Sequence, residues 1–265
     1  MDTLLETAIH AAREAGARVM ELYETTDFET KTDGSPLTVA DTSSHEVLVA
    51  HLSPTKIPIL SEESSESAND FTSGYPERLW IIDPIDGTRD FLKKTGDFAV
   101  MIGLLEHGRP TLGVVYAPAQ DKLYYAVRGE GAYLEHGGEL KRLSVSGSGN
   151  PLRCIRSVHH FKVRDASVIE KLGAITLPHG SIGIKAGLIA EGVGDFSFSW
   201  GNLGEWDVCA PEIITTEAGG KVTDTNGNPL SYGTKDHRIV GGMILSNGAC
   251  HEGVQRTLAS TPLEA

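Results

Sequence analysis

The sequence has little cysteine, little positive charge and no long hydrophobic run. Its three cysteines among 265 residues, Cys154, Cys209 and Cys250, are widely spaced and odd in number. They suggest neither a disulfide framework nor a Cys-x-x-Cys metal site, and a reducing cytoplasm is the simplest setting. With 23 basic against 36 acidic residues, the formal net charge is −13. We therefore expect neither a nucleic-acid polymer nor an anionic membrane as partner, because nothing broadly basic exists to meet their phosphates.

No apolar run reaches the roughly 18 residues that a membrane-spanning helix needs, and the N-terminus lacks the features of a signal peptide. We therefore expect no membrane insertion, no processing and a cytoplasmic location. The contents of 40% hydrophobic and 22% charged residues are ordinary for a globular protein. The chain is long enough for a sizeable core in one large domain or two closely packed ones.

Hydrophobic periodicity predicts two N-terminal helices followed by a β-meander. Thr3 and Glu6 form a capping box ahead of apolar residues at helical spacing, and a second helix is expected from about Val39 to Leu52. Short β-prone runs separated by glycine and proline turns then predict antiparallel strands. These runs are Ala99 to Leu105, Thr111 to Tyr116, Lys122 to Val127 and Gly131 to Leu134.

The turn-rich segment from Ser144 to Pro151 is the best candidate boundary, because it lacks apolar periodicity. Beyond it, strands and helices are expected to alternate. A helix is predicted at Ile182 to Ala190 and a late strand at Ile239 to Leu245.

The most informative stretch is residues 79–88, Leu-Trp-Ile-Ile-Asp-Pro-Ile-Asp-Gly-Thr. Its apolar half predicts a buried strand that ends at Asp83. Pro84 restricts the backbone on both sides of itself, so the turn can hold Asp86 near Asp83. Crowded carboxylates repel one another, and a hard divalent cation such as Mg²⁺ is the usual remedy. A common Asp-Pro or Asp-Gly turn is the alternative.

Gly87 and Thr88 extend this motif toward phosphate. Glycine lets backbone N–H groups approach an anion closely, and Thr88 is expected to open a helical segment whose N-terminus favours negative charge. Acids also follow a short strand at Ile57 to Leu60, as Glu62-Glu63, and begin a glycine-stopped helix, as Asp207. Taken alone, Glu62-Glu63 can be explained as a solvated surface pair and Asp207 as a simple helix cap.

In combination, these segments resemble the inositol monophosphatase superfamily of lithium-sensitive, magnesium-dependent phosphatases over nearly the whole chain. The residues that carry the resemblance are Asp41, Glu62-Glu63, Asp83-Pro-Ile-Asp-Gly-Thr88, Trp206-Asp207 and Glu217-Ala-Gly-Gly220. Asp83 to Lys94 and Trp206 to Glu212 are most similar to the branch of 3'(2'),5'-bisphosphate nucleotidases. The resemblance implies an α/β fold of the α+β layered sandwich type. An N-terminal half, residues 1–147, would carry an antiparallel sheet with helices and most metal ligands, and residues 148–265 a smaller mixed α/β sheet with Asp207 and substrate-side residues.

The resemblance also implies a metal centre with two or three Mg²⁺ ions. Glu62, Asp83 and the backbone carbonyl of Ile85 would hold one ion, and Asp83, Asp86 and Asp207 a second. One ion would activate a water that Glu62 and Thr88 orient for in-line attack on phosphorus, and the other would stabilise the leaving oxygen.

Further roles follow from the same resemblance. Asp41 would pair with the Thr88 hydroxyl, although a first-turn acid is an equal alternative from the residues alone. The substrate phosphate would meet Ile85, Asp86, Gly87, Thr88 and Asp207, and Lys185 matches a lysine of the nucleotidase branch.

Substrate choice is expected to favour a nucleotide over inositol. Inositol monophosphatases usually place a glutamate seven residues before the Asp of the Trp-Asp pair, where this chain has Trp200. Trp200 could stack a base or belong to the core. Arg89, Lys93 and Lys94 could neutralise a second phosphate or be surface charge. His159 and His160 are expected to be exposed polar residues.

The leading hypothesis is an enzyme that removes the 3'-phosphate of 3'-phosphoadenosine 5'-phosphate. Inositol 1-phosphate, histidinol phosphate and fructose 1,6-bisphosphate are alternative substrates for the same scaffold, and a non-catalytic metal- or nucleotide-binding protein is the alternative from another class. Family members are often dimers, so a homodimer is expected.

Overall fold

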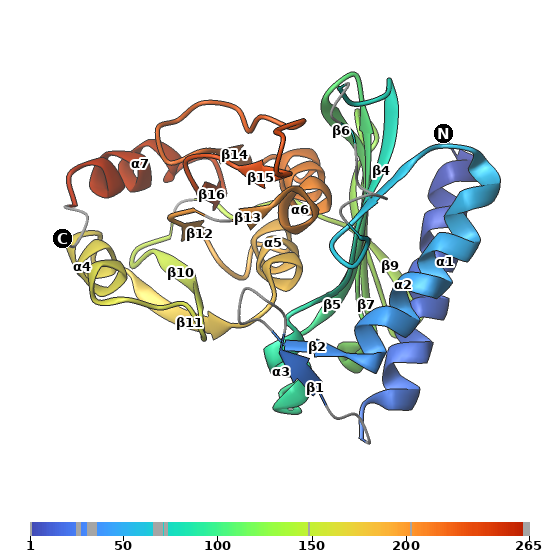
Figure 1. The fold of residues 1–265 in the computed structure, drawn as a ribbon. Coiled ribbons are helices and arrows are strands. Elements are labelled where there is room, and N and C mark those ends of the chain that lie inside the picture. Colours follow the sequence, from blue (N-terminus) through green and yellow to red (C-terminus); the bar gives the residue numbers. More distant parts are fainter. Residues whose placement is uncertain are drawn as a thin grey trace.

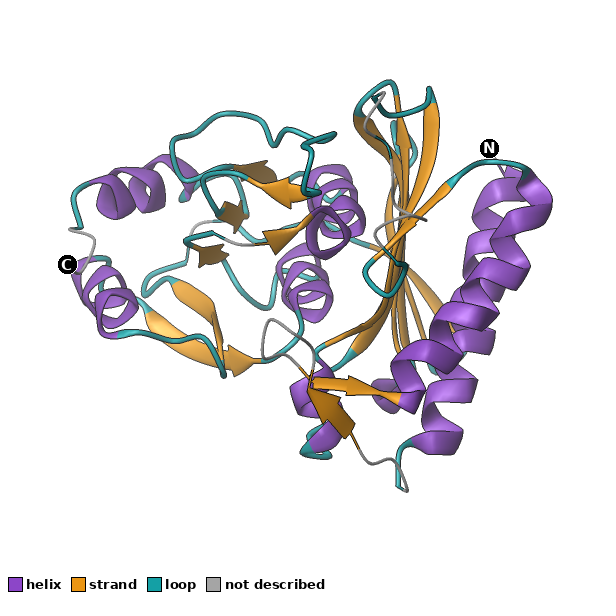
Figure 2. Ribbon diagram, in the orientation of Figure 1, coloured by secondary structure: helices purple, strands orange, loops and turns teal. Residues whose placement is uncertain are grey.

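Two β-sheets and three layers of helices stack into a five-layer α-β-α-β-α arrangement (Figure 1 and Figure 2). The computed structural model describes residues 2–24, 28–30, 36–65, 71, 74–147, 149–201 and 203–261. This layering confirms the expected fold class, with a large, mainly antiparallel sheet formed by the N-terminal half of the chain and a smaller mixed sheet formed by the C-terminal half.

The large sheet has seven strands in the order β3-β4-β5-β6-β7-β8-β9. All neighbours are antiparallel except β3 and β4, which are parallel. The predicted meander is confirmed. The strands are β3 (Ile59–Ser61), β4 (Arg78–Asp86), β5 (Ala99–Glu106), β6 (Arg109–Ala117), β7 (Lys122–Val127), β8 (Gly131–His136) and β9 (Glu139–Arg142).

The two N-terminal helices, α1 (Asp2–Leu22) and α2 (Val39–Leu52), lie side by side on one face of this sheet. Successive side chains of a strand point to opposite faces of the sheet, so α1 and α2 cover only every second residue. On β6, Val114 packs toward α1 and α2, and Val115 packs toward the helices on the opposite face. Two short strands, β1 (Phe28–Thr30) and β2 (Pro36–Thr38), form a hairpin before α2.

The central helix layer contains α5 (Ile182–Ala190) and α6 (Glu205–Glu217), which lie between the two sheets. Glycines allow α6 to approach the large sheet closely. A Cβ at Gly113 on β6 would overlap the Cγ2 of Ile213 and lie 2.9 Å from the carbonyl oxygen of Ala210. At Gly103 on β5 it would overlap the Sγ of Cys209. The three cysteines are all buried and free.

The smaller sheet has the order β11-β10-β12-β16-β14 and mixes parallel with antiparallel pairs. Alternation again separates its faces, since Ile155 packs toward α5 and α6 and Cys154 toward the outer helices. The remaining elements are β10 (Arg153–Ser157), α4 (Val163–Lys171), β11 (Ile175–His179), β12 (Phe196–Ser199), β13 (Leu203–Gly204), β14 (Lys221–Thr223), β15 (Arg238–Ile239), β16 (Met243–Ser246) and α7 (His251–Ala259), with α3 (Thr88–Leu92) and the 3₁₀ turns Ser53–Thr55 and Pro118–Gln120 in the N-terminal half.

Three local expectations were wrong. The strand predicted to end at Asp83 continues to Asp86, because a shift of register between these residues accommodates Pro84, which has no N–H for the ladder. The single strand expected at Ile239 to Leu245 is two strands, since Gly241 and Gly242 both have positive φ. Thr3 lies inside α1, which begins at Asp2, so it is not the N-cap.

The division at residues 147 and 148 stays a prediction. Within the described residues, no helix is both long enough and apolar enough to cross a membrane.

We expect Gly113→Ala to lower the free energy of unfolding by about 1–3 kcal/mol, because the new methyl group must displace Ile213 or the backbone of α6. Urea unfolding measures this difference. Gly253→Ala is the matched control, since a Cβ at Gly253 meets nothing within 4 Å and alanine is the better helix former. Equal stability of the two variants would contradict the close approach of α6 to β6.

Candidate metal centre and adjoining pocket

Three aspartates from distant parts of the chain meet between the two sheets. Asp83 and Asp86 lie at the irregular end of β4, and Asp207 lies in the first turn of α6. One carboxylate oxygen of each can be chosen so that all three atoms lie within 4.8 Å of one another. Asp83 and Asp86 are buried and Asp207 is partly buried. The structure therefore brings together the three aspartates that were predicted to share an ion.

Hydrogen bonds orient each carboxylate through one of its oxygens. The Oδ1 atom of Asp83 accepts the N–H of Ile85 at 3.0 Å. The Oδ2 atom of Asp207 accepts the N–H of Gly204 at 2.6 Å, as expected of an acid that caps its own helix. Each of these bonds uses one oxygen of the carboxylate, and the other oxygen can act as a metal ligand. Asp207 can therefore cap its helix and bind a cation at the same time.

Asp86 is held from the central helix layer. Its Oδ2 atom accepts hydrogen bonds from the hydroxyl group of Ser181 and, at 2.8 Å, from the N–H of Gly183. Ser181 is the N-cap of α5 and also accepts the N–H of Ile184. The N-terminus of α5 thus positions one aspartate of the cluster.

The electrostatics of the cluster favour a bound cation. Burial and then the neighbouring charges of Glu62, Asp86 and Asp207 raise the pKa of Asp83 well above its ordinary value. Burial and the charges of Glu62 and Asp86 do the same to the pKa of Asp207. Three clustered carboxylates offer only hard oxygen atoms, which is the donor set that Mg²⁺ prefers. The residues present therefore fit a divalent cation of this kind.

Glu62 reaches the same region because β3 runs parallel to β4. Ser61 pairs with Ile82, so Glu62 follows β3 beside Asp83, and its N–H donates to the carbonyl oxygen of Ile82 at 3.3 Å. Glu62 and Ile85 both line the pocket that contains the aspartates. Their roles as metal ligands stay predictions.

Asp41 and Thr88 are in direct contact. The hydroxyl group of Thr88 lies 3.1 Å from the Oδ1 atom of Asp41, and its alternative acceptor, the carbonyl oxygen of Ile85, lies at 3.2 Å. The other oxygen of Asp41 accepts the N–H and hydroxyl of Thr38, which closes the capping box of α2. Asp41 is therefore both a first-turn acid and a partner of Thr88. The polar, glycine-containing segment from Lys31 to Pro36 is predicted from the sequence to be a loop, and it lies outside the described residues except for Pro36, which begins β2.

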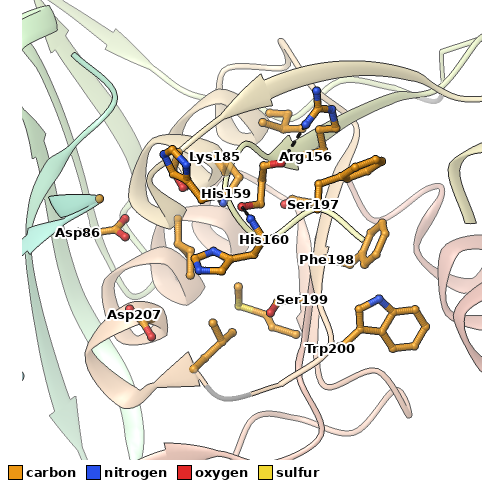
Figure 3. Close-up of a pocket in the computed structure, with 18 of the residues that line it drawn as sticks. Asp86, Arg156, His159, His160, Lys185, Ser197, Phe198, Ser199, Trp200 and Asp207 are labelled. Atoms are coloured by element: carbon orange, nitrogen blue, oxygen red, sulfur yellow. Dashed lines mark hydrogen bonds between the residues drawn. The ribbon is translucent and has the colours of Figure 1, made fainter. Parts of the chain in front are cut away.

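A cavity of about 610 Å³ extends from the aspartates toward the smaller sheet. Figure 3 shows Asp86 and Asp207 at one side of this pocket, Phe198 and Trp200 at the other, and His160 between them. Arg89, Arg156 and Lys185 also line it.

The basic residues of the pocket differ in their surroundings. Lys185 is buried, and its Nζ atom donates to the carbonyl oxygen of Gly180 at 3.1 Å. Burial lowers the pKa of Lys185, and the charges of Asp86 and Asp207 oppose that effect. Lys93 and Lys94 are not among the residues that line the pocket, and Lys94 instead packs over the rings of Tyr23 and Phe91.

Two polar contacts of the site went unpredicted. The Nε2 atom of His159 lies 2.7 Å from the Oδ2 atom of Asp90, which is buried, so His159 is not the exposed residue that was expected. His160 is exposed overall, as expected, and partial burial of its ring together with nearby positive charges lowers its pKa. The other unpredicted contact is the bond from Ser181 to Asp86, for which the serine just before the predicted helix at Ile182 was an available signal.

Comparison with known proteins identifies the class of this fold and site. A model of the inositol monophosphatase family matches residues 1–261. The chain belongs to this family, as the sequence resemblance predicted.

Individual relatives narrow the comparison. The chain is 33% identical over 248 residues to the 3'(2'),5'-bisphosphate nucleotidase CysQ of Escherichia coli K12, and the match covers 92% of this chain and 99% of the relative. The crystal structure of CysQ from Bacteroides thetaiotaomicron superposes with a TM-score of 0.81 at 31% identity and covers 92% of this chain and 97% of that one. An IMPase of Thermotoga maritima superposes with a TM-score of 0.82 at 29% identity and covers 98% of each chain.

The burial of Asp83 and the acidic groups around it predict a pH-dependent effect of Asp83→Asn in metal-free protein. An aspartate whose pKa is raised by folding binds more protons in the folded than in the unfolded state, so its contribution to stability falls as the pH rises above the unfolded value of about 3.9. We therefore expect the stability of the variant relative to wild type to increase from about pH 5 to about pH 8. Urea unfolding in the presence of a chelator measures the difference at each pH.

Asp195→Asn is the control, because folding shifts the pKa of Asp195 in the opposite direction, below its ordinary value. Burial raises the pKa of Asp195, but hydrogen bonds from Arg153 and Ser146 outweigh burial and lower it. This variant should be destabilised by a similar amount across the same pH range, where Asp195 is ionised in both states. A pH-independent effect of Asp83→Asn would show that burial and the neighbouring charges do not raise the pKa of Asp83 in the folded protein.

Proposed function

We propose that this chain is a magnesium-dependent 3'(2'),5'-bisphosphate nucleotidase that removes the 3'-phosphate of 3'-phosphoadenosine 5'-phosphate. The observation that carries the proposal is that the carboxylate cluster shares one cavity with the guanidinium groups of Arg89 and Arg156. Neither arginine forms an ion pair with a carboxylate among the described residues. A substrate with two phosphates can place one at the metal centre and the other against these arginines.

The relatives support the same activity. The CysQ proteins that match over most of this chain carry the name 3'(2'),5'-bisphosphate nucleotidase. A related IMPase/NADP phosphatase has been crystallised with Mg²⁺ and phosphate, so the cation proposed here has a precedent in the family.

In the proposed centre, the carboxylates of Glu62, Asp83, Asp86 and Asp207 and the carbonyl oxygen of Ile85 hold two Mg²⁺ ions, with a third as a further expectation. When bound, the ions supply Lewis-acid activation of water and neutralise charge on the phosphate oxygens. The burial of Asp83 and Asp86 excludes bulk water from the ligands and strengthens these interactions.

The residues Glu62, Thr88 and Asp41 prepare the nucleophile in this proposal. The Thr88 hydroxyl donates a hydrogen bond to Asp41, so its oxygen can accept a hydrogen bond from the attacking water. Glu62 and Thr88 together orient that water for in-line attack on phosphorus. This arrangement needs no covalent intermediate on the protein.

The phosphate that is cleaved would lie against the turn after β4. Gly87 has φ of 96° and is the N-cap of the short helix α3, and a Cβ there would lie 2.8 Å from the carbonyl oxygen of Asp97. Glycine therefore suits this turn, which directs backbone N–H groups of Gly87 and Thr88 toward the phosphate.

The opposite end of the cavity would bind the nucleoside. Phe198 and Trp200 are arranged edge to face with ring centroids 6.0 Å apart, and the indole N–H of Trp200 donates to Asp165 at 2.6 Å. Trp200 occupies the position at which inositol monophosphatases carry a glutamate, so a binding group for inositol hydroxyls is absent from it. The aromatic pair offers a surface for a base instead.

A panel of substrates tests the proposal. We expect kcat/KM with Mg²⁺ to be at least about tenfold higher for 3'-phosphoadenosine 5'-phosphate than for inositol 1-phosphate, histidinol phosphate or fructose 1,6-bisphosphate, because only the nucleotide fills both ends of the cavity. Highest efficiency on inositol 1-phosphate would reject the nucleotidase assignment. Binding without turnover of any substrate would favour the non-catalytic alternative, and Asp86→Asn serves as the inactive reference in these assays.

The second phosphate site has its own test. We expect Arg156→Ala to raise KM for 3'-phosphoadenosine 5'-phosphate by about tenfold to a hundredfold, because a charge-assisted hydrogen bond is lost. The KM for adenosine 3'-monophosphate, which has no second phosphate, should change little. Lys93→Ala is the matched control, since it removes an exposed positive charge that does not line the pocket. A parallel loss with both nucleotides would place Arg156 outside the second phosphate site.

A further inference from the structure

Two histidines and a glutamate converge on the surface of the α1–α2 helix pair. The Nε2 atom of His10 lies 3.3 Å from one oxygen of Glu14, and the Nε2 atom of His51 lies 3.2 Å from the other. The two imidazole rings are 4.9 Å apart at an interplanar angle of 84°. One ligand atom from each residue can be chosen so that all three lie within 4.8 Å of one another.

Both helices contribute to this cluster. His10 and Glu14 are four residues apart on α1 and therefore share one face of that helix. His51 comes from the last turn of α2. Asp41 lies in the first turn of α2, which puts the histidine about 15 Å away along the helix axis at 1.5 Å per residue. The cluster is thus separate from the carboxylates of the candidate metal centre.

The spacing of the three groups suits a tetrahedral transition metal. Zinc binds imidazole nitrogen and carboxylate oxygen at about 2.0–2.2 Å, so two ligand atoms of a tetrahedral ion lie about 3.3–3.6 Å apart. Each histidine nitrogen lies close to this distance from one of the two oxygens of Glu14, and one ligand atom of each residue can be chosen so that all three lie within 4.8 Å of one another. Imidazole nitrogen selects zinc and similar metals over Mg²⁺, which prefers oxygen.

We propose that His10, Glu14 and His51 form a zinc site that joins α1 to α2. The three side chains supply three ligands, and water completes the coordination at the exposed side. His10 and Glu14 are 62% and 52% exposed and His51 is 27% exposed, so an ion reaches the site from solvent without any movement of the core.

The consequence of such a site is structural. An ion bound by residues of both helices binds only when α1 and α2 are packed together, so it stabilises the folded state. The same contacts can also be explained by a glutamate that accepts one hydrogen bond from each histidine, and the two explanations differ in whether zinc binds.

Calorimetric titration of the full-length protein with Zn²⁺ tests the proposal. Prior treatment with chelator and dialysis into millimolar Mg²⁺ keeps the carboxylate cluster occupied by its own cation. We expect one zinc ion per chain to bind to the wild type. His10→Ala and His51→Ala should each weaken this binding at least about tenfold, because each removes one of three ligands. Excess zinc should raise the melting temperature of the wild type by about 5 °C and have little effect on either variant.

Matched controls separate this site from other histidines and from the aspartates. His107→Ala removes a histidine that has a single glutamate partner, Glu77, at 3.4 Å, and it should leave zinc binding unchanged. Asp83→Asn should also retain the zinc site, since it alters only the carboxylate cluster. Equal zinc binding by the wild type, His10→Ala and His51→Ala would overturn the proposal. So would loss of all zinc binding in Asp83→Asn.

Discussion

The candidate metal centre depends on one interaction, which is the repulsion among carboxylates that the fold buries close together. Asp83 and Asp86 are buried, and with Asp207 they bring oxygen atoms within 4.8 Å of one another. Without a cation, the ionised form of this cluster is unfavourable, because burial and neighbouring charge both raise the pKa values of the aspartates. The surrounding structure maintains it through strand pairing and helix caps, and a divalent cation would convert the repulsion into attraction.

The family, the meander of the large sheet and the motifs that carry the aspartates could be predicted because their signals are local. The apolar run of β4, the proline and glycine of its turn and the glycine stop of α6 are all readable from neighbouring residues. Resemblance then connected Asp83 and Asp86 with Asp207, which periodicity alone could not place beside them. The ligand roles assigned to Glu62 and Ile85 rest on that resemblance and stay predictions.

The unpredicted features depend on tertiary contacts. A proline normally ends a strand, yet Pro84 is accommodated because the register shift of β4 removes the need for its N–H, and its carbonyl oxygen accepts the hydroxyl of Ser44 from α2 at 2.8 Å. Nothing near His159 in the sequence indicates its partner Asp90, which lies in a different half of the chain. For Lys94 the sequence left a phosphate contact and surface charge as alternatives, and the side chain is exposed and packs over the rings of Tyr23 and Phe91.

The position of Asp207 in the first turn of α6 has a consequence for how the protein matures. Translation produces Glu62, Asp83 and Asp86 long before it produces Asp207, and α5, whose cap holds Asp86, also emerges later. A nascent chain therefore carries only part of the acidic cluster until Asp207 has been made. The proposed cation site is therefore complete only once α5 and α6 have been made and have docked on the large sheet.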